Sequence, residues 1–222
     1  MDIAILGGTG DIGEGLALRL AYDTSHDVLI GSRDAGRAET KAGEYETELD
    51  SRGVETTIEG GANEDVATLA DVVVVAVPPY YVDDTIEGVA DDLDEGDIVV
   101  TPATGMDRDE DGFHYAPPPA GSVTEHAASA VPDGVHLVGA FHNLAAGRLA
   151  NLDAGLGVDT FVVGEDEDAK GIVTDIAEGI EGLRALDAGG LANAAEVESL
   201  TPLLVNVATE NEGMHDLGLE LN

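Results

Sequence analysis

Apolar residues are concentrated in five short runs that do not alternate with polar residues. The first covers residues 2–6, and the others cover residues 28–31, 72–77, 98–100 and 137–140. Unalternated runs of this length are typical of strands that are buried on both faces of a parallel sheet. Helix-like stretches lie between the runs, including the leucine-rich segment 16–20 and residues 35–49. This succession of strands and helices predicts an α/β fold with a doubly wound parallel sheet.

The rhythm changes in the second half of the chain. An acidic cluster and three consecutive prolines predict a surface excursion over residues 107–121. We then predict a short strand at 160–163, a helix from about residue 165 and a long helix over 194–210. These elements are too few for a second full sheet. We therefore predict a nucleotide-binding domain over residues 1–150 and a small C-terminal α/β lobe over residues 151–222.

A glycine-rich turn follows the first predicted strand. It matches the pattern G-x-G-x-x-G with Gly8, Thr9, Gly10, Asp11, Ile12 and Gly13. Between a strand and a helix, such glycines let the backbone turn tightly and bring a diphosphate to the helix N-terminus. The pattern predicts a Rossmann dinucleotide site, with a merely structural tight turn as the alternative. Because the Asp11 carboxylate would repel a diphosphate, we expect its side chain to point away.

The few basic residues are unevenly placed. Three of the nine follow the second strand at intervals of four residues, namely Arg33, Arg37 and Lys41. In a helix this spacing puts them on one face. Guanidinium groups and the Ser32 hydroxyl suit a 2′-phosphate, whereas NAD enzymes usually carry an acid here, so we predict NADP. Asp34 is interpreted as a helix N-cap. The alternative is that the cations form ion pairs with Glu44 or Glu48.

The net charge of the chain indicates the medium in which the protein works. Forty-six acidic residues against 9 basic ones give a formal net charge of −37, while 43% of the residues are hydrophobic. That hydrophobic content argues against disorder. The charge excludes nucleic acid and anionic membranes as electrostatic partners. Because the acids are spread along the whole chain, we predict adaptation to a salt-rich medium, as in a halophile, rather than an acidic interaction protein.

The absence of some residue types and segments excludes several kinds of site. The chain has no Cys, so disulfides, thiolate nucleophiles and Cys-bound metals are excluded. The histidines show no ligand spacing, and we predict no metal site. The longest apolar run, residues 72–79, is far shorter than the ~20 residues of a membrane span, and no stretch resembles a signal peptide. We therefore predict a cytoplasmic protein.

Five longer stretches carry a resemblance to a known family. They are residues 5–20, 31–33, 150–153, 182–189 and 198–204. With them the chain resembles the coenzyme F420-dependent NADP reductases of archaea and some actinobacteria, in a haloarchaeal form, from Met1 to about Leu219. The resemblance implies hydride transfer between NADP(H) and the deazaflavin coenzyme F420. It also implies a homodimer or higher homo-oligomer, with the lobe 151–222 completing the deazaflavin site and forming the interface.

The resemblance also implies which residues meet the two cofactors. It places Thr9 to Ile12, Ser32, Arg33 and Arg37 on NADP. The remaining implied contacts lie along the crevice and around the rings and are Val77, Pro78, Pro79, Thr104, His142, Ala146 and Leu217. Hydride transfer of this kind requires stacked rings and excluded water, with neither a nucleophile nor a metal.

One histidine and two other functions remain open at this point. No residue is assigned as an acid or base. His142 is the one candidate to form a hydrogen bond with the deazaflavin or the nicotinamide amide, and a purely structural role for this histidine is an equally weighted alternative. The runner-up enzyme is an NADP-dependent reductase of a small imine or hydroxy acid, which usually has a long helical substrate domain. A non-catalytic NADP-sensing module is the third function, and binding without turnover would identify it.

Overall fold

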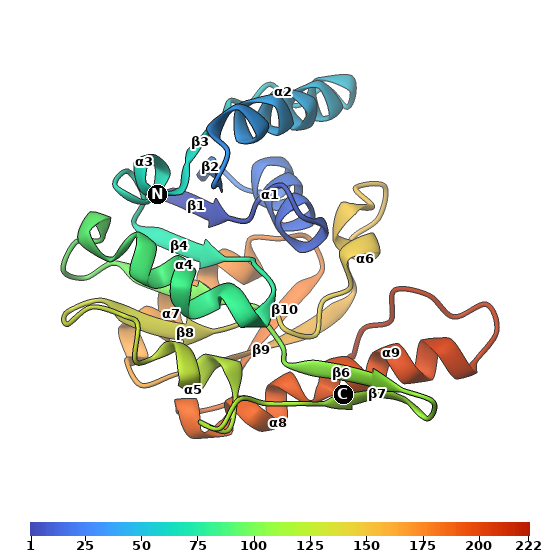
Figure 1. The fold of residues 1–222 in the computed structure, drawn as a ribbon. Coiled ribbons are helices and arrows are strands. Elements are labelled where there is room, and N and C mark those ends of the chain that lie inside the picture. The colour runs from blue at the N-terminus through green and yellow to red at the C-terminus, as the bar shows by residue number, and fades with distance from the viewer.

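One sheet of eight strands runs through the whole molecule in the computed structural model, which describes residues 1–222 (Figure 1). Two further strands, β6 and β7, pair only with each other. The strands are β1 (Asp2–Leu6), β2 (Asp27–Ser32), β3 (Ile58–Ala62), β4 (Val72–Val75), β5 (Ile98–Thr101), β6 (Met106–Asp109), β7 (Gly112–Tyr115), β8 (His136–Gly139), β9 (Val158–Gly164) and β10 (Leu183–Asp187).

The strand order confirms the predicted fold class. Across the sheet it reads β10-β9-β8-β5-β4-β1-β2-β3. Six neighbouring strands, β8, β5, β4, β1, β2 and β3, are mutually parallel. Their order is that of a doubly wound dinucleotide-binding fold. β9 pairs antiparallel with β8, and β10 pairs parallel with β9. All five strands predicted in the first 140 residues are present.

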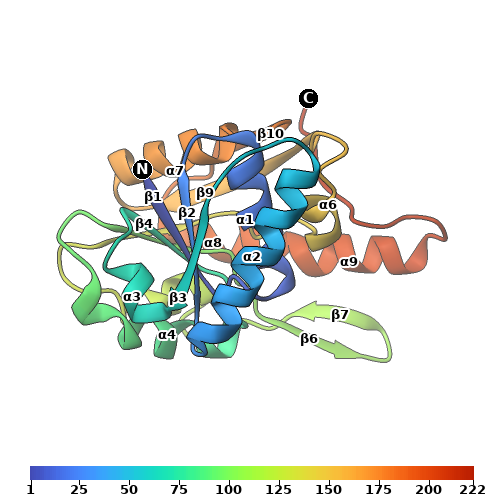
Figure 2. The ribbon, with the colours of Figure 1, turned by 90° about the horizontal axis from the view of Figure 1, so that it is seen from above.

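Helices cover both faces of the sheet (Figure 2). The helices are α1 (Asp11–Asp23), α2 (Ala35–Ser51), α3 (Asn63–Ala67), α4 (Val82–Gly88), α5 (Val123–Ala127), α6 (Ala146–Ala150), α7 (Glu167–Glu178), α8 (Ala194–Glu198) and α9 (Leu200–Glu210), with short 3₁₀ turns at Pro79–Tyr81, Ala90–Asp92 and Leu191–Asn193. Alternate residues of one strand serve the two layers: Ile3 and Ile5 pack with α1, α2 and α7, whereas Ala4 and Leu6 pack with α3, α4 and α5. Burial on both faces explains the unalternated apolar runs.

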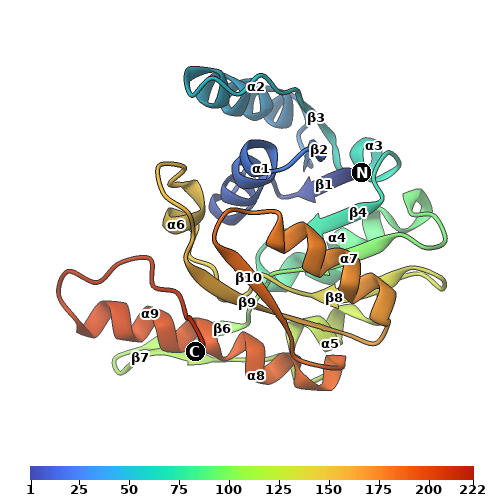
Figure 3. The same ribbon diagram turned by 180° about the vertical axis from the view of Figure 1, so that it is seen from behind.

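The C-terminal part of the chain both extends the sheet and leaves it. β9 and β10 add two strands to the same sheet, with α7 packed beside them. α9 instead runs away from the sheet, side by side with the β6–β7 hairpin from the middle of the chain, and the two form an arm (Figures 1 and 3). Asn206 of α9 joins the two, because its side-chain amide exchanges hydrogen bonds with both backbone groups of Phe113. The division at residue 150 stays a prediction.

One prediction for the second half needs correction. The long helix over 194–210 is wrong in its continuity, because α8 ends at Glu198 and α9 begins at Leu200. Pro202 explains the break, since it has no N–H to bond the carbonyl of Glu198 and its ring would clash there. The predicted surface excursion over 107–121 includes most of the β6–β7 hairpin, which pairs outside the main sheet.

No helix of this protein combines the length and the apolar character that crossing a membrane requires.

Candidate functional site

The predicted site residues gather at one edge of the sheet. Because the six neighbouring strands β8, β5, β4, β1, β2 and β3 are parallel, their carboxyl ends meet at the same edge. Gly8 follows β1 there, Ser32 ends β2, Val77 follows β4, Thr104 follows β5 and His142 follows β8. Residues far apart in the sequence are thus placed along one crevice, which is where ligands bind in open α/β sheets.

The glycine loop has the close packing that the sequence predicts. Gly7 has a φ of +82°, which strongly favours glycine. A Cβ on Gly13 would lie 2.5 Å from the Gly7 carbonyl oxygen, so the first turn of α1 fits directly against the loop. No side chain caps the N-terminus of α1 at Gly10. Its N–H groups are therefore available to an anion.

Asp11 stands at the first position of α1. Its side chain is exposed and makes no ion pair or hydrogen bond within the chain. An acidic residue in this first turn is stabilised by the positive end of the helix. The prediction that it points away from a bound diphosphate stays a prediction.

Tyr45 braces the glycine loop, and the sequence analysis missed it. This side chain of α2 is buried, and its hydroxyl lies 3.0 Å from the Gly8 carbonyl oxygen and 3.1 Å from Glu14 Oε2. Burial and the neighbouring Glu14 raise the pKa of Tyr45, so the phenol remains a donor. The spacing of four that links Arg37 and Lys41 continues to this residue, which is the signal that could have found it.

The three clustered cations are not equivalent. Lys41 forms ion pairs with Glu44 at 2.8 Å and Glu14 at 3.6 Å, so the ion-pair alternative holds for this residue. Arg37 makes no ion pair, and its Nη2 lies 3.4 Å from the carbonyl oxygen of Thr9 in the glycine loop. Two guanidinium groups, those of Arg33 and Arg37, therefore remain uncompensated beside the end of β2.

Two details complete this end of the crevice. Asp34 caps α2, because its Oδ1 accepts a hydrogen bond from the Arg37 backbone N–H at 3.2 Å, as predicted. Arg33 lies over the ring of Tyr81, with Cζ 5.8 Å from the ring centroid. Tyr81 ends the short turn that begins at Pro79, so the Arg33 guanidinium reaches the segment that follows β4.

A cavity of about 540 Å³ lies at the other end of the crevice. Three segments line it: the loop after β8 with the start of α6, helix α9, and the irregular segment that follows α9. The lining residues are Asn143, Leu144, Ala145, Ala146, Thr201, Leu204, Val205, Ala208, Thr209, Met214, His215, Asp216 and Leu217. Of the predicted contacts, Ala146 and Leu217 thus line the same cavity.

Hydrogen bonds fix the position of this cavity relative to the crevice. Thr201 Oγ1 lies 3.4 Å from Thr104 Oγ1 at the end of β5, which places the cavity next to a predicted site residue. Arg148 holds the outer wall, because it donates to the carbonyl oxygens of Leu156 at 2.6 Å and Asp216 at 2.8 Å. The cavity is therefore built by tertiary contacts and not by one element.

His142 lies behind the cavity wall. The residue is 4% exposed, and its ring Nε2 lies 3.3 Å from Thr124 Oγ1 in α5. Burial lowers the pKa of His142 to about 3, so the imidazole is neutral at physiological pH. Nδ1 has no hydrogen-bond partner. A direct contact of this ring with a cofactor stays a prediction.

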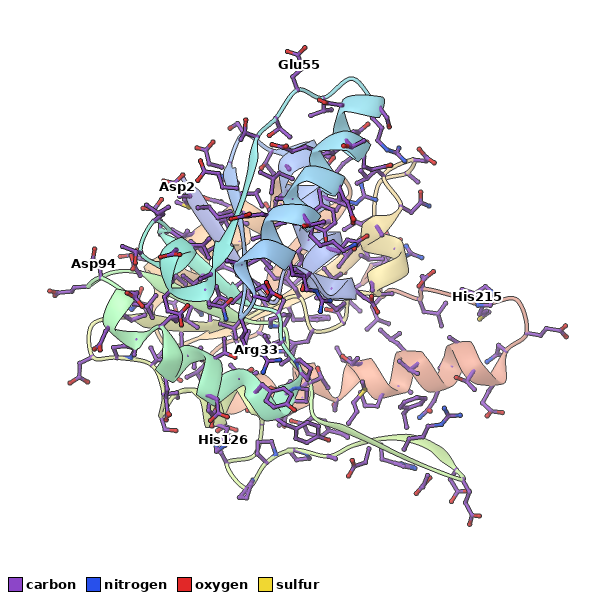
Figure 4. All side chains as sticks on the ribbon, turned by 45° about the horizontal axis from the view of Figure 1, so that its top comes forward. Asp2, Arg33, Glu55, Asp94, His126 and His215 are labelled. Carbon is purple, nitrogen blue, oxygen red and sulfur yellow. The ribbon has the colours of Figure 1, made fainter.

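The acidic groups do not assemble into a further site. No group of three or more His, Asp and Glu side chains is arranged to hold a metal ion. Acidic side chains project outward from separate parts of the surface, as Asp2, Glu55 and Asp94 illustrate in Figure 4. The crevice near Arg33 is thus a locally basic region on an acidic protein.

Comparisons with known proteins agree with this geometry. A family model described as NADP oxidoreductase, coenzyme F420-dependent, matches residues 2–105. A protein of Methanocaldococcus jannaschii named F420-dependent NADP reductase is 39% identical over 219 residues, which cover 96% of each chain. A protein of the same name from Methanothermobacter thermautotrophicus is 36% identical over 214 residues, 95% of this chain and 90% of its own.

A solved structure shows the same relationship in three dimensions. A protein from Arthrobacter sp. FB24, provisionally named an F420-dependent NADP reductase, matches with a TM-score of 0.81 and 25% sequence identity, covering 100% of this chain and 99% of that one. The resemblance found in the sequence is therefore confirmed, and the chain belongs to the family of F420-dependent NADP reductases.

Proposed function

We propose that this protein transfers a hydride between NADP(H), bound along the glycine loop, and coenzyme F420, bound in the cavity beside α9. The observation that carries the proposal is the adjacency of the two regions. The cavity of about 540 Å³ adjoins the carboxyl end of β5, where the nicotinamide of a dinucleotide in this crevice would lie. The relatives named F420-dependent NADP reductase favour this function over an imine reductase and over a non-catalytic module.

The chain's own residues supply binding and orientation. The glycine loop and the free N–H groups of α1 suit the diphosphate, and Ser32, Arg33 and Arg37 suit the 2′-phosphate. Apolar side chains of α9, such as Leu204 and Val205, would cover a flat ring and exclude water from it. When bound, the two coenzymes supply the hydride chemistry themselves, so that positioning is the protein's main contribution.

A spectroscopic assay tests the function. In molar KCl, NADPH mixed with oxidised coenzyme F420 should bleach the visible absorbance of the deazaflavin. Ala208→Trp, which would fill the cavity, should cut this rate about a hundredfold by misplacing the ring, while the Kd for NADPH is unchanged. Glu210→Trp places the same indole outside the cavity and serves as the control. Absence of bleaching by the unaltered protein, with NADPH binding intact, would refute the function.

We infer further that the protein works in a salt-rich cytoplasm. The net charge of −37 implies strong self-repulsion in dilute buffer. The Debye length falls from about 10 Å at 0.1 M salt to about 3 Å at 1 M, which screens this repulsion. Between 0.1 and 3 M KCl, the thermal unfolding midpoint and the activity should therefore both rise. Matched sorbitol solutions stabilise by exclusion but do not screen charge, so they should raise both by less than KCl does. Equal values at the two KCl concentrations would contradict the inference.

We also propose a homo-oligomer that covers the arm. The outer side of α9 exposes Leu203 and Val207, at 54% and 37%, on an element that already extends away from the sheet. A second copy would bury this apolar surface, which is favourable in proportion to its area. Sedimentation velocity in molar KCl should give the mass of a dimer or larger species, and Leu203→Asp should shift it toward the monomer. A monomer for the unaltered chain would exclude the proposal.

A further inference from the structure

A buried carboxylate with only neutral partners lies behind the cavity. Glu198, the last residue of α8, is 0% exposed. Its Oε1 accepts hydrogen bonds from the backbone N–H and the hydroxyl of Thr124, both at 2.9 Å. Its Oε2 accepts from the Val123 N–H and the Tyr115 hydroxyl, both at 3.0 Å. Burial raises the pKa of Glu198, and the bonds from Thr124 and Val123 oppose that rise. Four donors on two oxygens match a carboxylate, which only accepts.

The carboxylate determines how the neighbouring hydroxyl is used. Thr124 has a single hydroxyl hydrogen, which it donates to Glu198. The Thr124 oxygen can then only accept from His142 Nε2, which lies 3.3 Å away. The proton of the neutral imidazole is consequently on Nε2, and Nδ1 is left as an acceptor without a partner.

The backbone of residue 142 is anchored by the same segment. Thr201 Oγ1 donates to the His142 carbonyl oxygen at 2.8 Å. Glu198 and Thr201 lie on either side of Ser199, where α8 ends and α9 begins, so this junction holds both the ring and the carbonyl. The preceding residue, Phe141, has a φ of +66°, which is rare for a bulky residue and persists only where its surroundings hold it.

We propose that Glu198 and Thr124 are positioning residues for hydride transfer: the carboxylate orients the Thr124 hydroxyl, which fixes His142 in one tautomer and one orientation. His142 begins the loop whose next four residues line the cavity, so a misplaced ring would also shift that wall. The kinetic consequence rests on the proposed function. The tautomer does not, because it is a property of the protein without cofactors.

Nitrogen-15 NMR of histidine-labelled protein tests the tautomer directly. The His142 signals, assigned by their loss in His142→Gln, should show a proton on Nε2 in the unaltered chain. Thr124→Val keeps the side-chain shape but removes the hydroxyl, and should yield a mixture of tautomers, as should Glu198→Gln. Thr124→Ser keeps the hydroxyl and should retain the Nε2 proton. A proton on Nδ1 in the unaltered chain, or an unchanged tautomer in Thr124→Val, would overturn the proposal.

Kinetics separate positioning from mere structural support. In Thr124→Val, kcat should fall about tenfold to a hundredfold with the KM for NADPH unchanged, because the rings are misplaced, and Thr124→Ser should restore it. Tyr115→Phe is the matched control, because Tyr115 bonds the other oxygen of Glu198 and should affect stability but not the tautomer. A kcat loss in Thr124→Val that only follows its unfolded fraction would contradict the positioning role. If the unaltered chain does not reduce F420, the proposed function fails, while the NMR result still decides the tautomer.

Discussion

Replacing Arg33 and Arg37 together by alanine should weaken NADP binding roughly a hundredfold while leaving NAD binding within about twofold. Each guanidinium is expected to contribute about 1.5 kcal/mol through a charge-assisted contact with the 2′-phosphate, at the low end of the usual range because molar salt screens it. NAD lacks that phosphate and so has nothing to lose. Isothermal titration calorimetry in molar KCl, with each single and the double variant, measures both affinities.

Lys41→Ala provides the matched control for this experiment. The residue lies one turn beyond Arg37 on α2, but its ammonium is already paired with Glu44 and Glu14. Its removal should therefore change NADP affinity much less than removal of either arginine. Equal losses of NAD and NADP affinity in the double variant would refute a 2′-phosphate site. They would instead indicate that the arginines support the glycine loop, through contacts such as that of Arg37 with Thr9.

The parts of the fold that the sequence predicts are those decided by local patterns. The first five apolar runs are buried on both faces, so their strands could be located without tertiary information. Strand β3 was missed because its sequence, Ile-Glu-Gly-Gly-Ala, has little strand propensity and forms beside β2. Residue Gly60 is required there, because a Cβ would meet the backbone of Ala38 at 2.5 Å. Only the packed structure reveals that constraint.

The candidate site likewise has parts that a local sequence pattern reveals and parts that only the packed structure reveals. The glycine loop and the arginines lie within 30 residues of one another, and their spacing identifies them. Glu198 is invisible to such a reading, because it is one of 46 acidic residues and its partner Thr124 lies 74 positions away. The many acidic residues therefore conceal the buried carboxylate of Glu198. Sequence patterns identify site residues that are close together in the chain. Site residues that are far apart in the chain are identified only from the packed structure.

Arg19→Met should lower the free energy of unfolding by about 3–5 kcal/mol, the usual cost of leaving a buried ionic partner and several polar groups unsatisfied. The Arg19 guanidinium, 1% exposed, donates to the carbonyl oxygens of Leu149 at 2.9 Å and Ala154 at 2.7 Å, and also to that of Asn151. It further pairs with buried Asp23 at 3.6 Å. Methionine fills a similar volume but donates to none of these groups, and Asp23 keeps only the hydrogen bond from the Glu181 backbone N–H.

Urea unfolding at a constant 3 M KCl measures this loss, because added urea leaves the screening unchanged. Arg19→Lys should lie between the two proteins, since an ammonium keeps the charge but lacks the planar fork that reaches several carbonyls. Arg52→Ala is the control. Arg52 also binds the segment after α6, through Asp153 at 2.5 Å, but this ion pair lies on the surface. The urea midpoint of Arg52→Ala should therefore stay near that of the unaltered chain. Because Arg19 pins the end of α6 and Ala146 of that helix lines the cavity, Arg19→Met should also raise the KM for F420. A large loss of stability with an unchanged KM would show that the cavity wall is held independently of this arginine.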